Sequence, residues 1–132
     1  MKEIVPVSGA PKPGGHYSHA VRTGNLLYTA GQIPIDPATG QLVDGGIAAQ
    51  TRQVMHNLET VLAAAGLDFS HVVNANVYVD DIANMPIVNG IYAEFFPADP
   101  PARTSVQVAG LPLGSLIEVG LIAAFDPVLA VE

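Results

Sequence analysis

The spacing of apolar residues changes along the chain, which indicates that helices and strands both form. Over residues 47–65 the apolar residues recur with the 3.6-residue period of an amphipathic helix, and Gly66 follows as a stop signal. Over residues 71–80 the sequence HVVNANVYVD alternates, as in a strand with one polar face. The apolar face of that strand is expected to hold Val73, Ala75, Val77 and Val79, and the polar face Asn74, Asn76 and Tyr78. These two patterns predict an α+β fold.

The other elements follow from the same patterns and from the turn residues between them. A tight turn at residues 23–25 joins two strands, and the Pro-, Gly- and Asp-rich residues 31–46 are expected to form an ordered loop. A second helix begins near Asp81 or Asn84, packs Ile87, Ile91 and Phe95, and ends before Pro97. Further strands are expected at residues 3–7, 16–23, 26–30, 103–109 and 116–125. Residues 1–132 then form a single domain, with two helices on one face of a mixed sheet and the other face open.

The composition favours a self-associating protein. Charged residues make up 13% of the chain against a typical figure of about 25%, and the mean hydropathy is +0.36, so a monomer would leave apolar surface exposed. A second subunit is the natural cover for the open sheet face. The net charge of −7 and the lack of a basic patch argue against nucleic acid as a partner. Without cysteine, the chain forms neither a disulfide nor a thiolate metal site. No apolar run is long enough for a signal peptide or a membrane span, and a cytoplasmic protein is expected.

Arg103 is one of only five Lys and Arg residues, and it begins a half-buried strand. Alternation places Arg103, Ser105 and Gln107 on one face of that strand. In the final strand, the apolar residues share one face and Glu118 lies on the other. If residues 110–113 form a four-residue hairpin loop, Ser105 pairs with Glu118 and the three polar groups form one patch. A loop of three or five residues would send Glu118 to the other side. The patch is either a structural ion pair or a site where Arg103 binds a small carboxylate and Glu118 holds a water.

The histidines favour structural roles over metal binding. His16 and His19 face opposite sides of an extended segment, His56 lies on the polar side of the long helix, and His71 begins a strand. No metal site is expected, and the motifs of nucleotide-binding loops and of hydrolase nucleophiles do not occur. Tyr17 follows two glycines, from where its phenol could lean over the pocket of a neighbouring subunit.

Six motifs, in their order and spacing, resemble the Rid family of imine deaminases, also called the YjgF family. They are GGHYSHAV, AGQIPIDPATGQLV, AAQTRQVMHNLETVLAAAGLDFSHVVNANVYVDD, VNGIYAEFFP, PPARTSVQV and IEVGLIAA. The resemblance runs from about Tyr17 to Phe125. It implies a chorismate-mutase-like fold assembled as a homotrimer, with an inner barrel of sheets and active sites between subunits. It also implies hydrolysis of 2-imino and 2-enamino acids, such as 2-aminoacrylate, to 2-keto acids and ammonia without a cofactor.

The resemblance also implies roles for individual residues. The carboxylate-binding arginine of the family falls on Arg103, the water-positioning glutamate on Glu118 and the pocket tyrosine on Tyr17. The loop glycine falls on Gly31 and the asparagine on Asn89. Three features depart from the family pattern: Ala30 replaces a hydroxyl residue, Ser105 replaces a cysteine, and GHYSH, with His16 and His19, replaces GPYSQ.

The expected mechanism needs no metal and no covalent nucleophile. Arg103 holds the substrate carboxylate, helped by backbone N–H groups near Gly31 and Ser105, and water held by Glu118 attacks C2 of the imine. Three other interpretations stay open. They are a pathway-specific deaminase of an aminomuconate-type enamine, a trimer that binds a small ligand without turnover, and an RNA-cleaving or translation-inhibiting protein, against which the charge counts.

Overall fold

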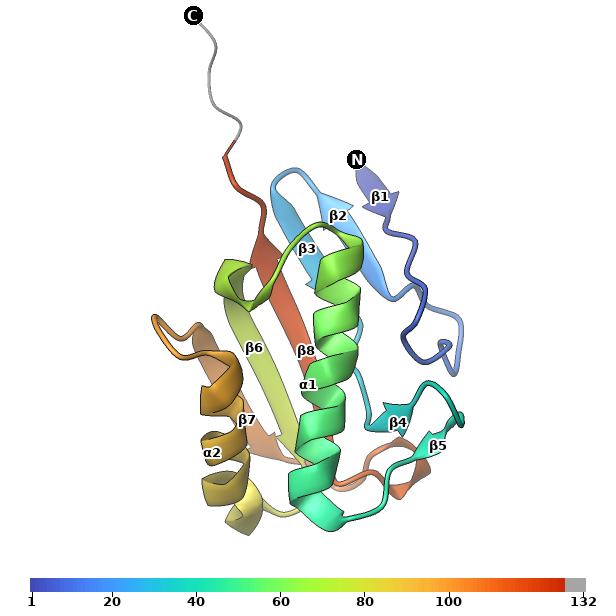
Figure 1. Ribbon diagram of the computed structural model, residues 1–132, viewed down its shortest axis with the longest axis vertical. Helices are drawn as coiled ribbons and strands as arrows, with labels where there is room; N and C mark the ends of the chain where they lie inside the picture. The colour runs from blue at the N-terminus through green and yellow to red at the C-terminus, as the bar shows by residue number, and fades with distance from the viewer. Residues whose placement is uncertain (128–132) are drawn as a thin grey trace, which may run out of the picture.

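A six-stranded mixed sheet carries both long helices on one face (Figure 1). The computed structural model describes residues 1–127. The helices are α1 (Gly46–Ala64) and α2 (Met85–Phe95). The strands of the sheet are β1 (Lys2–Ile4), β2 (Ala20–Thr23), β3 (Leu26–Thr29), β6 (Val72–Val79), β7 (Ala102–Gln107) and β8 (Ile117–Ala124). Their order across the sheet is β1-β2-β3-β8-β6-β7, and only β6 and β7 run parallel. The predicted α+β class is confirmed.

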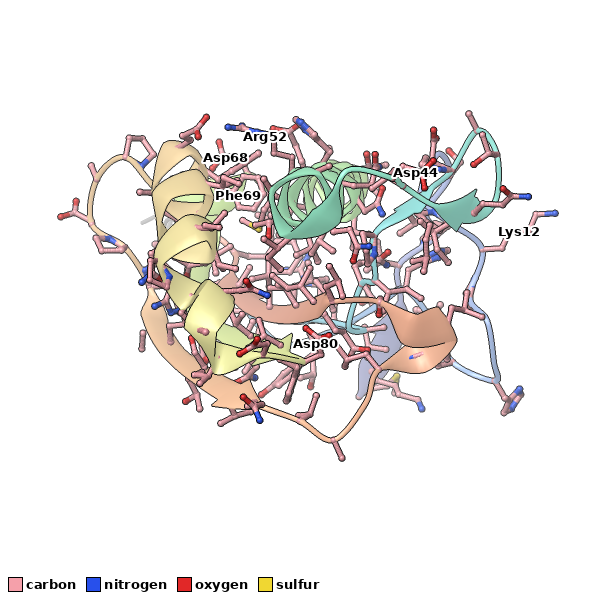
Figure 2. The ribbon with its side chains drawn as sticks, turned by 90° about the horizontal axis from the view of Figure 1, so that it is seen from below. Lys12, Asp44, Arg52, Asp68, Phe69 and Asp80 are labelled. Carbon is pink, nitrogen blue, oxygen red and sulfur yellow. The ribbon has the colours of Figure 1, made fainter. Side chains whose placement is uncertain are left out.

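The core lies between the sheet and α1. The apolar stripe predicted for this helix is buried: Val54, Leu58, Val61 and Leu62 have no exposed surface. Figure 2, a view turned by 90°, also shows α1 and α2 on the same side of the sheet. Helix α2 packs through Val88 and Ile91, whereas Ile87, predicted to pack, is 48% exposed. None of the helices in residues 1–127 combines the length and the apolar character needed to cross a bilayer.

Residues 31–46 and the start of β2 differ from the prediction. Residues 31–46 contain a small hairpin of β4 (Ile35–Asp36) and β5 (Gln41–Leu42), where the sequence predicted a loop without strands. Its turn is held by Asp36, whose Oδ1 accepts the N–H of Ala38 at 2.9 Å. Strand β2 begins at Ala20 rather than at residue 16, because the preceding segment folds back on itself. The carbonyl of Pro11 and Nε2 of His19 lie 2.6 Å apart and close this segment.

The polar and apolar faces of β6 are as predicted except at its start. The pairing of β6 with β8 shifts between Val72 and Asn74, as at a β-bulge. The bulge places Val72 in the core, while Val73 is 46% exposed. Ala75, Val77 and Val79 face the helices, and the partly exposed side chains of Asn74, Asn76 and Tyr78 lie on the open face.

The predicted hairpin between the last two strands is wrong. Strand β6 lies between β7 and β8, pairing parallel with the first and antiparallel with the second. Helix α2 connects β6 to β7, and a strand pair joined through a helix runs parallel. Residues 110–116 therefore cross an end of β6 instead of making a tight turn, and they include the 3₁₀ turn η3 (Pro112–Gly114).

Candidate functional site

Glu118 lies on β8 with its side chain on the open face of the sheet. In the pairing with β6 it stands opposite Tyr78, whereas its neighbours Ile117 and Val119 are buried beneath the helices. The carboxylate is partly buried, and this burial raises the pKa of Glu118 above its ordinary value. A carboxyl group with a raised pKa is better able to exchange protons near neutral pH than an exposed glutamate.

Gly31 lies directly against Glu118 because β3 leaves the sheet just before it. The N–H of Leu121 donates to Oγ1 of Thr29, the last residue of β3, at 2.9 Å. The chain rejoins β8 at Gln32, whose N–H donates to the carbonyl of Val119 at 2.8 Å. A Cβ atom at Gly31 would lie 2.9 Å from Cδ of Glu118 and still closer to Oε2, so a larger residue here would have to displace the Glu118 side chain. Within residues 1–127, the N–H of Gly31 donates to no acceptor.

A cavity of about 310 Å³ opens beside Glu118 and Gly31. Tyr17 borders the same cavity, and its hydroxyl oxygen accepts a hydrogen bond from the N–H of Gly14 at 3.0 Å. Most other wall residues are apolar: Pro11, Pro13, Ile33, Ile35, Pro112 and Leu113. The cavity therefore combines the Glu118 carboxylate and the Tyr17 phenol with a largely apolar wall, to which Lys12, His19 and Gln32 add polar groups.

Two polar residues of α1 hold the walls of this cavity, and the sequence analysis did not single them out. The side-chain amide of Asn57, which is 2% exposed, donates to the carbonyl of Ile35 at 2.9 Å. Oε1 of Gln50 accepts the N–H of Leu116 at 2.8 Å, beside the η3 turn. Both amides lie on the buried side of a helix whose other buried residues are mostly apolar, and this position in the helical period could have revealed them.

Arg103 lies on the opposite face of the sheet from Glu118. It pairs with Ala75, whose side chain is buried under the helices, so the Arg103 side chain projects toward α2. Its guanidinium carbon lies 4.8 Å from the centroid of the Tyr92 ring. None of the ion pairs formed within residues 1–127 includes Arg103. The guanidinium is thus held by an aromatic face and keeps its hydrogen-bond donors available to an anion.

Asn89 and Tyr92 border a shallow depression together with Arg103. Burial raises the pKa of the Tyr92 hydroxyl, although the nearby Arg103 guanidinium acts in the opposite direction. Oγ of Ser105, two residues along β7 from Arg103, is buried and has no hydrogen-bond partner among the described residues. The depression therefore offers one cation and one side-chain amide without a carboxylate.

The predicted patch of Arg103, Ser105 and Glu118 is wrong for a single chain. Ser105 pairs with Val77 and faces the helices, as does Gln107, which pairs with Val79. Glu118 occupies the other face, one strand further on. This arrangement also excludes a structural ion pair between Arg103 and Glu118 of the same chain. The six predicted residues fall into two groups: Glu118, Gly31 and Tyr17 at the cavity, and Arg103, Asn89 and Ser105 on or beside the depression.

The four histidines make different contacts. His71 caps the 3₁₀ turn η1 (Phe69–His71), accepting the N–H of Asp68 through Nδ1 at 3.2 Å, as expected of a capping histidine. His56 is exposed on α1, and its ring packs edge-on against Phe95. His16 is exposed near Ala30, and His19 borders the cavity while its Nε2 contacts the Pro11 carbonyl. In residues 1–127, no three His, Asp or Glu side chains cluster as metal ligands would.

The chain is similar to several known proteins over nearly its whole length. The sequence model of a family described as endoribonuclease L-PSP matches residues 7–125. A RutC family protein of Pyrococcus horikoshii is 47% identical over 123 residues, covering 93% of this chain and 98% of the relative. The 2-iminobutanoate/2-iminopropanoate deaminase of Rattus norvegicus is 43% identical over 127 residues, covering 96% and 93%.

The fold is also similar to that of solved structures. A protein of unknown function of the conserved Rid family, from Yersinia pestis, superposes with a TM-score of 0.91 at 41% sequence identity. The match covers 94% of this chain and 99% of the Yersinia chain. The mixed sheet and its two helices are therefore those of the Rid fold.

Proposed function

The chain belongs to the endoribonuclease L-PSP family, also called the Rid or YjgF family, and we propose that it hydrolyses reactive 2-imino and 2-enamino acids to 2-keto acids and ammonia. The observation that carries the proposal is the placement of the Glu118 carboxylate against Gly31, beside a cavity of about 310 Å³. A partly buried carboxylate with a raised pKa suits the positioning and deprotonation of a water. The deaminase activity named for the rat relative is the same chemistry.

The proposed site needs two copies of the chain. Arg103 and Glu118 occupy opposite faces of one sheet, so a small substrate that contacts both must lie between subunits. We propose a homotrimer in which Arg103 and Asn89 of one subunit face Glu118, Gly31 and Tyr17 of the next. The low charge content and the open sheet face favour such an assembly.

In the proposed reaction, the Arg103 guanidinium binds the substrate carboxylate through two parallel N–H···O hydrogen bonds. The N–H of Gly31, which donates to no acceptor within residues 1–127, helps to fix the substrate beside Glu118. Ser105 has a smaller role, because its Oγ is enclosed on the helix side of β7. An enamine first tautomerises to the imine, whose C2 is the electrophile.

Water then adds to C2 of the imine while Glu118 accepts one proton from it. The carbon–oxygen bond forms as the C=N π electrons move to nitrogen, and Glu118 returns the proton to that nitrogen, which gives the neutral carbinolamine. Glu118 then takes the hydroxyl proton of the carbinolamine and passes it to the nitrogen. The C–N bond breaks, and ammonia leaves as the C=O bond of the 2-keto acid forms. The steps consume one water, and their proton transfers fit the raised pKa of Glu118.

Ammonia release from freshly generated imines tests the proposal. An amino-acid oxidase supplies the imine, and the wild-type chain is expected to accelerate its hydrolysis. Arg103→Ala should lower kcat/KM by at least about 100-fold, because two charge-assisted hydrogen bonds of roughly 1.5–3 kcal/mol each are lost. Arg52→Ala is the matched control, since Arg52 pairs with Glu94 at 2.9 Å on the exposed side of the helices (Figure 2).

The outcomes separate the alternatives. Full activity in Arg103→Ala would remove the carboxylate-binding role. Tight binding of a keto acid without turnover would favour a ligand-binding protein, and turnover of an aminomuconate-type enamine alone would favour a pathway-specific deaminase. An RNA cleavage assay on the same preparation addresses the activity that the family description names, against which the net charge of −7 counts.

A further inference from the structure

Leu113 adopts a backbone conformation that leucine rarely occupies. Its φ is 58° and its ψ is 18°, in the left-handed region where a Cβ atom crowds the backbone. Among residues 1–127, Asp99 is the other non-glycine residue with a positive φ, and Asp tolerates this region better than Leu. The Leu113 side chain is also 71% exposed. Residues held in sparsely populated conformations cluster at functional sites, which makes this leucine a candidate for a role in binding.

The conformation of Leu113 is fixed by its surroundings. The N–H of Gly114 donates to the carbonyl of Leu111 at 3.2 Å, and the N–H of Ser115 donates to that of Pro112 at 3.1 Å. Gln50 of α1 anchors the next residue, Leu116, at 2.8 Å. The η3 turn is thus held on both sides of Leu113, which presents an apolar side chain to solvent from a defined position.

That position is on the wall of the Glu118 cavity. Leu113 and Pro112 form one part of its wall, and Ile33 and Ile35 form another. With a volume of about 310 Å³, the cavity lies at the lower end of the usual range for small-molecule pockets, roughly 300–1,000 Å³. An imino acid with a single methyl substituent would leave much of this apolar space unfilled.

We propose that Leu113 determines specificity by favouring 2-imino acids with an extended apolar side chain over the imine of alanine. This inference rests on the proposed function. With the substrate carboxylate on Arg103 of a second copy and C2 beside Glu118, the substituent on C2 enters the apolar part of the cavity. Contact with that substituent covers the Leu113 side chain, and the burial of apolar surface favours the larger substrate.

The test compares two imines in the wild-type protein and in two variants of Leu113. D-amino-acid oxidase generates the imines of alanine and leucine, and semicarbazide trapping reports how fast each is hydrolysed. Leu113→Asn should lower kcat/KM for the leucine imine by about tenfold, the low end of what a lost apolar contact costs, with little change for the alanine imine. Leu113→Met should keep the wild-type ratio because it keeps an apolar side chain.

Two controls isolate the side chain from the backbone. Asn suits a left-handed conformation, so Leu113→Asn should raise the melting temperature by about 3 °C. Asp99→Asn changes the other left-handed position and should leave the ratio of the two rates at its wild-type value. If Leu113→Asn fails to fold, Leu113→Gly gives the same test, because glycine adopts this conformation at no steric cost.

Each outcome decides the inference. A wild-type protein that hydrolyses both imines with a ratio unchanged in Leu113→Asn would overturn the role of Leu113 and leave the proposed function standing. Equal loss of both rates together with a changed oligomeric state would assign Leu113 to a subunit contact instead. A wild-type protein that hydrolyses neither imine would overturn the proposed function and this inference together.

Discussion

Arg103 and Glu118 project from opposite faces of one sheet, with β6 between their strands. Two interstrand spacings of ~4.8 Å separate β7 from β8, so about 10 Å and the thickness of the sheet lie between the two side chains. Arg103 rests on Tyr92 of α2, and Glu118 rests on Gly31 beyond β3. Neither group has a partner of opposite charge within residues 1–127. Two incomplete half-sites in one chain favour a complete site between two chains.

Mixing two inactive variants should restore activity if the site lies between subunits. Arg103→Ala keeps Glu118, and Glu118→Ala keeps Arg103. In a cyclic assembly of randomly mixed chains, about a quarter of the interfaces combine an intact Arg103 with an intact Glu118. Refolding the two variants together should therefore recover up to about a quarter of the wild-type rate of ammonia release.

The control for this experiment is each variant refolded alone. Each should remain inactive and elute at the wild-type position in size exclusion. A mixture that forms mixed oligomers, detected by a tag on one variant, yet stays inactive would place the reacting groups within one chain. That result would contradict the two-subunit site, whatever the activity of the wild-type protein.

The helices and the class of the fold could be predicted because they depend on local periodicity. The buried stripe of α1 and the end of α2 before Pro97 both follow from the spacing of residues a few positions apart. The bulge at Val73 could not be predicted this way, since a bulge is defined by the partner strand. Strand pairing depends on contacts far apart in sequence.

The main error in the predicted site came from pairing the two strands nearest in sequence. The segment from β6 through α2 to β7 has the pattern of a crossover, which makes those two strands parallel neighbours and leaves the other edge of β6 to β8. Alternation correctly grouped Arg103 with Ser105, but it could not say which side of the sheet they face. The role of Tyr92 as a platform was missed because its contact with Arg103 links α2 to β7.

Activity should depend on pH through Glu118. Burial raises the pKa of this carboxyl above the ordinary 4.5, so the acid limb of the kcat/KM profile should have its midpoint above that value. The rate should rise with pH as the carboxylate forms. Glu118→Gln should lower kcat by about 100-fold or more, the usual contribution of an acid–base group, and should abolish this limb.

Stability gives an independent check on the same group. Because the folded pKa of Glu118 is raised, its favourable contribution to folding is present below the unfolded pKa and is lost as pH rises through the folded pKa. Glu118→Gln should therefore be more stable than wild type near neutral pH, with the difference shrinking below pH 4.5. Denaturant unfolding at several pH values measures it, and a difference that stays constant with pH would contradict the raised pKa.

Gly31→Ala should displace the Glu118 carboxylate. The new Cβ would lie 2.9 Å from Cδ of Glu118, so either the side chain or the loop must move. We expect kcat to fall by about 100-fold, the effect of a misplacement of about 1 Å. Gly90→Ala is the matched control, because a Cβ there meets nothing within 4 Å and alanine favours the helix. Wild-type kcat in Gly31→Ala would show that Glu118 need not be held against this glycine.

Tyr92 should act as a positioning residue for Arg103. The Tyr92 ring is 7% exposed and packs against Phe96, with 4.6 Å between ring centroids, so it offers a fixed surface to the guanidinium. Replacing it with leucine should remove a cation–π contact of roughly 0.5–2 kcal/mol. Tyr92→Leu is therefore expected to raise KM by about 2- to 30-fold while kcat changes little.

Tyr92→Phe keeps the ring and removes a hydroxyl that is buried without a hydrogen-bond partner in residues 1–127. It should retain the wild-type KM. Its free energy of unfolding should be about 1 kcal/mol larger than that of the wild type, because the cost of burying the unpaired hydroxyl is removed. Phe69→Leu serves as the control, because Phe69 packs against Phe96 at 5.2 Å and does not touch Arg103. It should lower stability without changing KM. If KM rises equally in Phe69→Leu and Tyr92→Leu, Tyr92 acts through general packing. If KM rises only in Tyr92→Leu, the aromatic face of Tyr92 supports carboxylate binding by Arg103.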